Sequence, residues 1–307
     1  DRQKVFLWLI ILFIMLTFVF RNIDEDSWGD RRTLYLPPDG RKSYYDKTMD
    51  DVIIVYVAWL VIDSPGYYRL SEDVLLSNYI SGILINSDNV TVDGQGHTIK
   101  SDSVYGESAV YVNASKNVTI MNITIVGWSR GVFIINSSSV MVIDCTIQDS
   151  AEGIKLKDSD NVTLIGNTFI GCSVLIENSF NNSLINNSVD GFPLIYLEQE
   201  NNITVSEVGQ IMVMNCSNIC ISNIVFPNIN TPVSIIYSNT CIVQNCIINS
   251  SRTGLIISDS SSIIIQRNNF TNNVQGILIH DSANVTLCGN MFLQNNNGTI
   301  IESSCNI

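Results

Sequence analysis

Apolar and polar residues alternate along most of this chain, in short stretches separated by Gly, Asn, Asp and Ser. The stretch NSDNVTVDGQGHTIK at residues 86–100 shows the pattern, with Val90 and Val92 on either side of Thr91. Alternation with a period of two is typical of half-buried β-strands, and Asn and Gly favour the corners between strands. We therefore expect many short strands and no long helices.

The stretch recurs about every 22 residues, as in SKNVTIMNITI, SDNVTLIGNTF and SANVTLCGNMF. We take the residue at the start of each copy as an anchor. The anchors are Asn89, Asn117, Ser139, Asn161, Asn181, Asn202, Asn218, Asn239, Ser262, Asn284 and Asn306. Helical repeats would need apolar residues at a 3.6 period, and leucine-rich repeats would need regularly placed leucines. Neither pattern is present, so the period predicts an all-β fold, a parallel β-helix of roughly ten to eleven coils over residues 62–307.

Within a coil, the residues one and three after the anchor are expected to face inward, as with Val162 and Leu164, and Thr163 outward. A second asparagine column is expected to form amide ladders between coils that stack at about 4.8 Å. Its members are Asn167, Asn187, Asn245, Asn268 and Asn290. We expect Gly94 and Gly96 to turn a corner at positive φ, and His97 to line the first coil.

The chain begins with an apolar run, Val5 to Phe20, that follows Arg2 and Lys4. As a helix this run would extend roughly 24 Å, slightly short of a bilayer core of about 30 Å. We expect residues 1–21 to be a transmembrane anchor that leaves the rest of the chain outside. The alternative is a secretory signal, although no small-residue cleavage site follows. We expect residues 22–50 to be a linker or stalk and residues 51–307 the β-helix, with residues 52–62 as its N-terminal cap strand.

Composition and charge narrow the classes of function. The chain has 307 residues, a net charge of −13 and only 15% charged residues. Because the chain has no basic patch to neutralise phosphates, we do not expect it to bind nucleic acid. The eight cysteines form no CxxC pair, so we do not expect a zinc site.

Two kinds of covalent modification are predicted. Cys220 and Cys241 each lie two residues after an anchor, so both are expected to point outward on successive coils, close enough for a disulfide. The alternative is a stack of two free thiols. An exported chain with many N-x-[ST] sequons is expected to be glycosylated. The candidate acceptors are Asn89, Asn113, Asn117, Asn122, Asn136, Asn161, Asn181, Asn186, Asn202, Asn215, Asn249, Asn269, Asn284 and Asn297.

The run SPGYYRLSEDV, followed by DNVTVDGQGHTI and tandem NVTL-G-N coils, resembles the NosD-like family of right-handed parallel β-helices. The resemblance covers about residues 62–307 and groups the chain with carbohydrate-binding and sugar-hydrolase β-helix repeats. It implies a right-handed solenoid, and its relatives include archaeal-type surface proteins. In the family's namesake the role is maturation of a copper enzyme.

The outward positions just before each anchor form the candidate column for chemistry. In it, Lys157, Glu177 and Glu198 are the weak catalytic candidates, because adjacent coils would bring the two glutamates about 5 Å apart at the backbone. With Lys155 nearby, these groups are also candidates to hold a sugar acid or a calcium ion. His280, Asp281 and Glu302 are weaker metal candidates. No resident cofactor is expected, because no cluster of the soft ligands that copper favours is present in the pattern.

These observations favour a membrane-anchored extracellular β-helix with a structural, adhesive or glycan-binding role, rather than an enzyme. The expected partners are the membrane, glycans or other cell-surface proteins, and further copies of the chain that stack end to end on the last coil. The alternative is a polysaccharide lyase, hydrolase or epimerase that uses the outward sheet face. A NosD-like role in the maturation of a copper enzyme is a further alternative.

Overall fold

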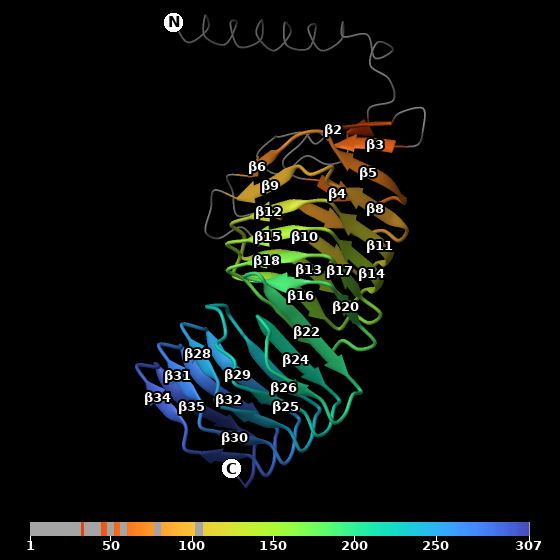
Figure 1. Cartoon of the computed structure of the whole chain (residues 1–307). Coiled ribbons are helices and arrows are strands. Elements are labelled where there is room, and N and C mark those ends of the chain that lie inside the picture. Colours follow the sequence, from red (N-terminus) through yellow and green to blue (C-terminus); the bar gives the residue numbers. More distant parts are fainter. Residues whose placement is uncertain are drawn as a thin grey trace, which may run out of the picture.

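The computed structural model describes residues 60–76, 81–101 and 107–306, and the backbone of three further strands at 32–33, 44–47 and 52–55. These residues form an all-β parallel solenoid of about 11 coils with about 22 residues each. No helix occurs in the described part of residues 89–306, as the alternation predicted. Figure 1 shows that the coils stack in two arms that meet at an angle. We call residues 60–191 the N-terminal arm and residues 192–306 the C-terminal arm.

The N-terminal arm has three strands per coil, and each strand pairs in parallel with the strand three places later in the sequence. The six-stranded sheet contains β4 (Leu60–Ile62), β7 (Ile83–Ile85), β10 (Ser108–Asn113), β13 (Arg130–Ile135), β16 (Glu152–Lys157) and β19 (Val174–Glu177). The nine-stranded sheet contains β1 (Arg32–Thr33), β2 (Tyr44–Lys47), β3 (Val52–Val55), β5 (Gly66–Leu70), β8 (Val90–Asp93), β11 (Lys116–Met121), β14 (Ser138–Ile143), β17 (Thr163–Ile165) and β20 (Ser183–Ile185). The third sheet has twelve strands and continues into the C-terminal arm. Its strands in the N-terminal arm are β6 (Val74–Leu76), β9 (Thr98–Ser101), β12 (Thr124–Val126), β15 (Thr146–Gln148), β18 (Thr168–Ile170) and β21 (Ser188–Val189).

The C-terminal arm repeats this arrangement. Its part of the twelve-stranded sheet contains β22 (Phe192–Glu198), β24 (Gln210–Met214), β26 (Val233–Ile236), β29 (Thr253–Ser258), β32 (Gln275–His280) and β35 (Asn297–Glu302). The five-stranded sheet contains β23 (Thr204–Val205), β25 (Cys220–Ser222), β27 (Ile242–Gln244), β30 (Ile264–Gln266) and β33 (Thr286–Cys288). The three-stranded sheet contains β28 (Ile247–Asn249), β31 (Asn269–Thr271) and β34 (Met291–Leu293).

Near the N-terminus, the structure changes the expectations for the linker and for the cap strand. The predicted transmembrane anchor at residues 1–21 lies outside the described residues, and no helix among the described residues is long and apolar enough to cross a membrane. Within the predicted linker, β1 and β2 pair antiparallel, and β2 also pairs with β3, so part of this segment belongs to a sheet. The predicted cap strand at 52–62 is two strands, because β3 pairs with β5 whereas β4 pairs with β7 in another sheet.

The corners follow the anchors, with one correction. All of the predicted anchors except Asn239 have positive φ, for example 57° at Asn161 and 56° at Ser262. Asn and Ser tolerate this left-handed conformation because a short polar side chain can bond locally. In the exceptional coil the left-handed residue is Thr240 at φ 56°. The anchor was therefore placed one residue too early in that coil.

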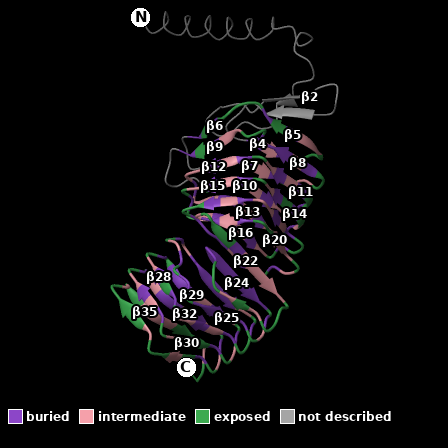
Figure 2. Cartoon of the chain, in the orientation of Figure 1, coloured by how far each residue is buried: buried purple, intermediate pink, exposed green. Residues whose placement is uncertain are grey.

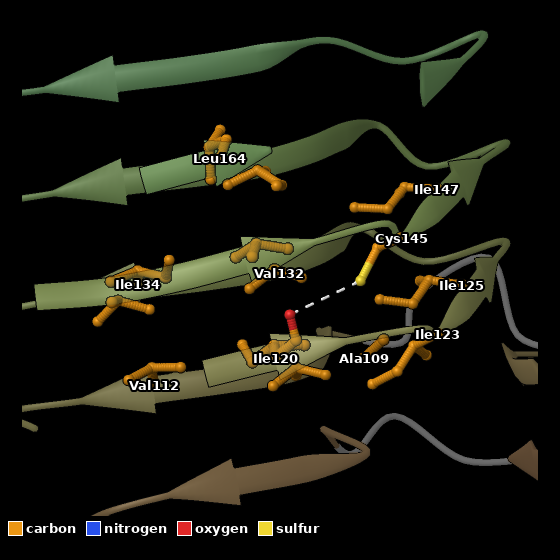
Figure 3. Close-up of a cluster of buried hydrophobic side chains, with 14 of the residues drawn as sticks. Ala109, Val112, Ile120, Ile123, Ile125, Val132, Ile134, Cys145, Ile147 and Leu164 are labelled. Carbon is orange, nitrogen blue, oxygen red and sulfur yellow. Dashed lines mark hydrogen bonds between the residues drawn. The ribbon is translucent and has the colours of Figure 1, made fainter. Parts of the chain in front are cut away.

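The core fills the inside of the coils with branched aliphatic side chains. Val162 and Leu164 are fully buried and Thr163 between them is half-buried, as predicted. The view in Figure 3 shows how such residues from successive coils stack on one another. Gly131 lies where one coil begins, and an added Cβ would lie 2.4 Å from the Gly153 carbonyl oxygen. The start of β13 therefore has no room for a side chain unless the neighbouring coil shifts.

Polar ladders line the inner corners. Asn167 accepts a hydrogen bond from the Cys145 amide at 3.0 Å, and its own amide donates to Asn187 Oδ1 at 2.9 Å. The ladder therefore exists as predicted in this arm. In the C-terminal arm it runs through Asn268 and Asn290, but Cys246 takes the place that we assigned to Asn245.

The alternation did not reveal a second ladder, made of buried serines. The Ser115 amide donates to Ser137 Oγ at 3.1 Å, and the Ser137 amide donates to Ser159 Oγ at 3.1 Å. In the C-terminal arm the Ser238 amide donates to Ser260 Oγ at 3.0 Å. These hydroxyls satisfy corner amides that would otherwise be buried without a partner.

The stack of coils is interrupted between the two arms. In a continuous solenoid β22 would pair with β19, but β19 is the edge of its sheet. Instead, β22 pairs antiparallel with β21, with Ser188 opposite Pro193 and Val189 opposite Phe192. The parallel β-helix expected over residues 62–307 is therefore interrupted at this point.

The outer face of the C-terminal arm covers the open end of the N-terminal arm. Met212 and Met214 belong to the buried core of the N-terminal arm, whereas Ile211 and Val213 belong to the core of the C-terminal arm. All of β24 is buried (Figure 2). Because apolar area removed from water stabilises by roughly 25 cal/mol per Å², this face acts as a cap for the first arm.

The Gln210 side chain joins the arms by making the hydrogen bonds that a neighbouring strand would make with β19. Its Oε1 accepts a hydrogen bond from the Val174 amide at 2.9 Å. Its Nε2 donates to the Val174 carbonyl at 2.6 Å and to the Thr231 carbonyl at 2.9 Å. The side chain is only 1% exposed. It therefore satisfies both backbone groups that β19 presents at Val174 on its free edge.

Candidate functional site: an aromatic and charged sheet face

The outer face of the six-stranded sheet gathers the most varied side chains of the N-terminal arm. Register places Tyr111, Phe133 and Lys155 in one column and Ile135, Lys157 and Glu177 in the next. Arg130 and Glu152 form a third column at the start of the strands. We call Tyr111, Arg130, Phe133, Glu152, Lys155, Lys157 and Glu177 the aromatic–charged face.

Two rings form the apolar part of this face. The ring centroids of Tyr111 and Phe133 are 5.2 Å apart, with planes inclined by 14°. The guanidinium carbon of Arg130 lies 4.8 Å from the Phe133 centroid. An arginine over a ring is favoured by the ring quadrupole, so the cation and the rings form one continuous surface. Tyr111 and Phe133 lie 22 residues apart at the outward position in the middle of their strands, so reading that second outward column would have found them.

The charged part of the face is a network. Arg130 Nε lies 3.2 Å from Glu152 Oε2. Lys155 Nζ lies 2.9 Å from Glu177 Oε1 and 3.9 Å from Glu152 Oε1. Lys157 forms no ion pair within the described part of the chain. The face therefore holds its carboxylates in ion pairs, and the Lys157 ammonium group has no such partner among the described residues.

The predicted pair of Glu177 and Glu198 does not form. The two residues lie on β19 and β22, which are not neighbours in any sheet. Glu198 instead accepts hydrogen bonds from the amides of Asn181 and Asn182 at 2.8 and 3.0 Å, and from the Tyr196 hydroxyl at 2.8 Å. Burial and this bond to Glu198 raise the pKa of Tyr196. Glu198 is therefore part of the contact between the arms.

The metal candidates are only partly brought together. His280 Nδ1 lies 2.8 Å from Asp281 Oδ2, and Glu302 is opposite His280 on the next strand. His97 lies on the other arm, where its Nδ1 is 3.3 Å from Asp73 Oδ1. Among the described residues, no three His, Cys, Asp or Glu side chains are placed to hold one metal ion.

The corner at Gly94 and Gly96 differs in part from the prediction. Gly96 has φ 82°, as expected. Gly94 is not a positive-φ residue, and its requirement is space, since an added Cβ would lie 2.4 Å from the Asn122 carbonyl oxygen.

The sequence analysis overlooked a buried carboxylate at this corner. Asp93 is only 3% exposed and accepts hydrogen bonds from the Tyr67 hydroxyl at 2.5 Å and the Gln95 amide at 2.9 Å. Desolvation raises its pKa, but the bonds from Tyr67, Gln95 and Asn122 outweigh it and the net pKa of Asp93 is lowered.

The cysteines do not adopt the predicted geometry. Cys220 lies opposite Ile242, and Cys241 is buried, because the anchor of that coil is Thr240. A shift of one residue moves a side chain to the other face of a strand, so both thiols are free and they do not share a face. Burial raises the pKa of Cys145 and of Cys172 to about 12.

Copper would need sulfur or imidazole ligands in one place. The two histidines of the chain, His97 and His280, lie on different arms, and no three His, Cys, Asp or Glu side chains among the described residues are placed to hold one metal ion. The described residues therefore do not fit a copper site.

Comparisons with known proteins agree with this fold. Residues 69–206 match the family described as periplasmic copper-binding protein (NosD), and residues 194–307 match the one described as right handed beta helix region. No curated protein matches the sequence.

Solved structures with similarity to the chain include an alginate epimerase, a polygalacturonase and an alginate lyase. The periplasmic alginate epimerase AlgG is 16% identical with a TM-score of 0.35, over 80% of this chain and 64% of that one. The polygalacturonase from Erwinia carotovora ssp. carotovora is 14% identical with a TM-score of 0.41, over 83% and 86%. The alginate lyase from Paenibacillus sp. str. FPU-7 is 11% identical with a TM-score of 0.40, over 77% and 94%. The chain thus spans less than two thirds of the epimerase.

The two family matches together extend from residue 69 to residue 307. With the stacked parallel coils of both arms, they support a likeness of this chain to NosD-like right-handed parallel β-helix proteins.

Proposed function

We propose that this protein is an exported β-helix that binds an acidic polysaccharide through the aromatic–charged face. The observation that carries the proposal is the continuity of the Tyr111 and Phe133 rings with a fixed ion network and the unpaired Lys157. Aromatic rings offer apolar surface with little loss of side-chain entropy, and an ammonium group attracts a carboxylate. The three cations on this face are three of the eight Lys and Arg residues after residue 60, in a chain with net charge −13.

A polysaccharide-processing enzyme is the second candidate. Such chemistry needs two carboxyl groups at a set separation, one of which holds a proton to donate. Glu177 is paired with Lys155, and Glu198 bonds backbone amides in the contact between the arms. These engagements favour binding over catalysis. A role in copper-enzyme maturation has no comparable support among the described residues.

Calorimetric titration of the full chain tests the proposal. The ligands are a polyuronate and, for comparison, neutral dextran. We expect binding of the polyuronate only, weakened about tenfold or more by Phe133→Ala, since tenfold corresponds to about 1.4 kcal/mol. Lys157→Gln should reduce the salt dependence of binding. The control is Met141→Ala, an exposed residue on another sheet.

The possible outcomes separate the candidates. Absence of polyuronate binding, or binding that neither variant changes, would contradict the proposal. Tyr111→Ala guards against a folding defect in Phe133→Ala, because both remove one ring of the pair. Release of unsaturated or new reducing ends from the polymer would instead support the enzyme.

The location at a cell surface belongs to the same proposal. A family described as periplasmic supports export, and protease treatment of intact cells would test exposure of the chain. Anchoring through residues 1–21, adhesion, an archaeal source and end-to-end stacking of copies stay predictions.

A further inference from the structure

An apolar stripe runs along the outer face of the nine-stranded sheet. Met121, Ile143, Ile165 and Ile185 lie opposite one another on β11, β14, β17 and β20. Ile185 is 47% exposed, and Met141 in the neighbouring column is 40% exposed. Met121, Ile143 and Ile165 are half-exposed, so the stripe is continuous over four strands. Large contiguous apolar patches on a protein surface mark sites that another group covers.

The sequons of the N-terminal arm lie along both borders of this same sheet. Asn89, Asn136, Asn161 and Asn181 lie in the corner that leads into the sheet, Asn113 ends β10 and Asn117 is the second residue of β11. The corner that leaves the sheet carries Asn122 and Asn186. No sequon of this arm falls in the strands of the twelve-stranded sheet at 98–101, 124–126, 146–148 and 168–170 or in the described corners that follow them. The acceptors therefore follow both borders of the nine-stranded sheet, and the first of these borders is shared with the six-stranded sheet, where Asn113 lies opposite Ile135.

Two sequons directly follow residues of the stripe in the sequence. Asn122 follows Met121 and Asn186 follows Ile185, and both asparagines are exposed. They turn the corner at φ 55° and 54°, so their side chains leave the sheet at its border. Asn122 Nδ2 donates to Asp93 Oδ1 at 3.3 Å, a bond that a glycosylated amide can keep because it retains one N–H.

We propose that N-linked glycans on Asn122 and Asn186 cover the apolar stripe of the nine-stranded sheet. In the transfer step, Nδ2 bonds to the anomeric carbon of an oligosaccharide, the amide loses one proton, and the lipid diphosphate that carried the sugar departs. The apolar faces of the sugar rings then lie on Met121 and the isoleucines, while the hydroxyls face water. The bulk of the glycans keeps other chains from this sheet and leaves the aromatic–charged face free.

Close spacing limits how many of the other sequons can carry a glycan. Asn161 and Asn181 lie on adjacent coils, which stack about 4.8 Å apart, too close for two bulky glycans. The amide of Asn117 donates to Asn89 Oδ1 at 3.1 Å, so these two also lie side by side. We therefore expect fewer glycans than sequons along this corner.

The first experiment is peptide mass mapping of the full chain, purified from the cells that produce it, before and after enzymatic removal of N-glycans. We expect modification at Asn122 and Asn186, and not at both Asn161 and Asn181 of one molecule. Recovery of Asn122 and Asn186 only as unmodified peptides would overturn the inference. The inference rests on the proposed export of the chain and not on polysaccharide binding, which the Phe133→Ala titration tests separately.

The second experiment tests whether the glycans cover the apolar stripe. After deglycosylation we expect binding of an apolar dye and light scattering to increase at least twofold. The double variant Ile143→Ser and Ile165→Ser should lose this increase. Val126→Ser, on an outer face without sequons, is the control and should retain it. Dye binding and scattering that do not change on deglycosylation would overturn the covering role.

Discussion

Replacement of Gln210 by alanine should destabilise both arms together. The change leaves the Val174 amide, the Val174 carbonyl and the Thr231 carbonyl without their partner, in a place where Gln210 is 1% exposed. A buried group left unpaired costs about 1–3 kcal/mol, and partial rearrangement recovers some of the three losses. We expect the free energy of unfolding to fall by about 3–5 kcal/mol, which is large for one substitution.

The assay is urea unfolding followed by circular dichroism, with amide hydrogen exchange at Val174 as the local measurement. Gln266→Ala is the matched control, because Gln266 bonds Gln244 at 2.8 Å on an outer face and lies away from the contact between the arms. The control should change the free energy by less than about 1 kcal/mol. Equal unfolding midpoints for the two variants, or a Val174 amide that stays protected in Gln210→Ala, would refute the strand-imitating role.

Three further predictions concern the solenoid itself. The pKa of Asp93 is lower in the folded than in the unfolded protein, so its contribution to stability is complete above the unfolded value of 3.8 and is lost as pH falls towards the folded value. Asp93→Asn should therefore flatten the acid side of a profile of melting temperature against pH. A profile that the substitution leaves unchanged would count against this role. Gly131→Ala should cost about 1–3 kcal/mol in urea unfolding, since its Cβ would lie 2.6 Å from Ile147 Cγ2, and a neutral result would show that the start of β13 can move away from its neighbours. The Cys145 thiol, whose pKa burial raises to about 12, should resist alkylation at pH 8 in the native protein while exposed Cys288 reacts, as mass spectrometry would show; equal labelling rates would contradict this.

The sequence by itself determined the coil and its inside. Asn161 has the left-handed φ of 57° that a corner requires, and Val162 and Leu164 after it are fully buried. These features are local, since one residue's conformation and the alternation of two faces repeat in every coil. The Tyr111 and Phe133 pair was also within reach, because its 22-residue spacing repeats the same period.

The tertiary structure decided the register of one coil and the meeting of the two arms. Asn239 and Thr240 are both plausible corner residues, and only the pairing of Asn239 with Ser217 on the preceding coil shows that Thr240 takes the left-handed position. The sequence gives one sign of the break after β21, since the apolar residues Met212 and Met214 occupy outward positions. No local rule, however, tells which surface they cover. That choice depends on apolar area buried between segments far apart in the chain, and such burial is non-directional, so it is settled only when the two arms pack.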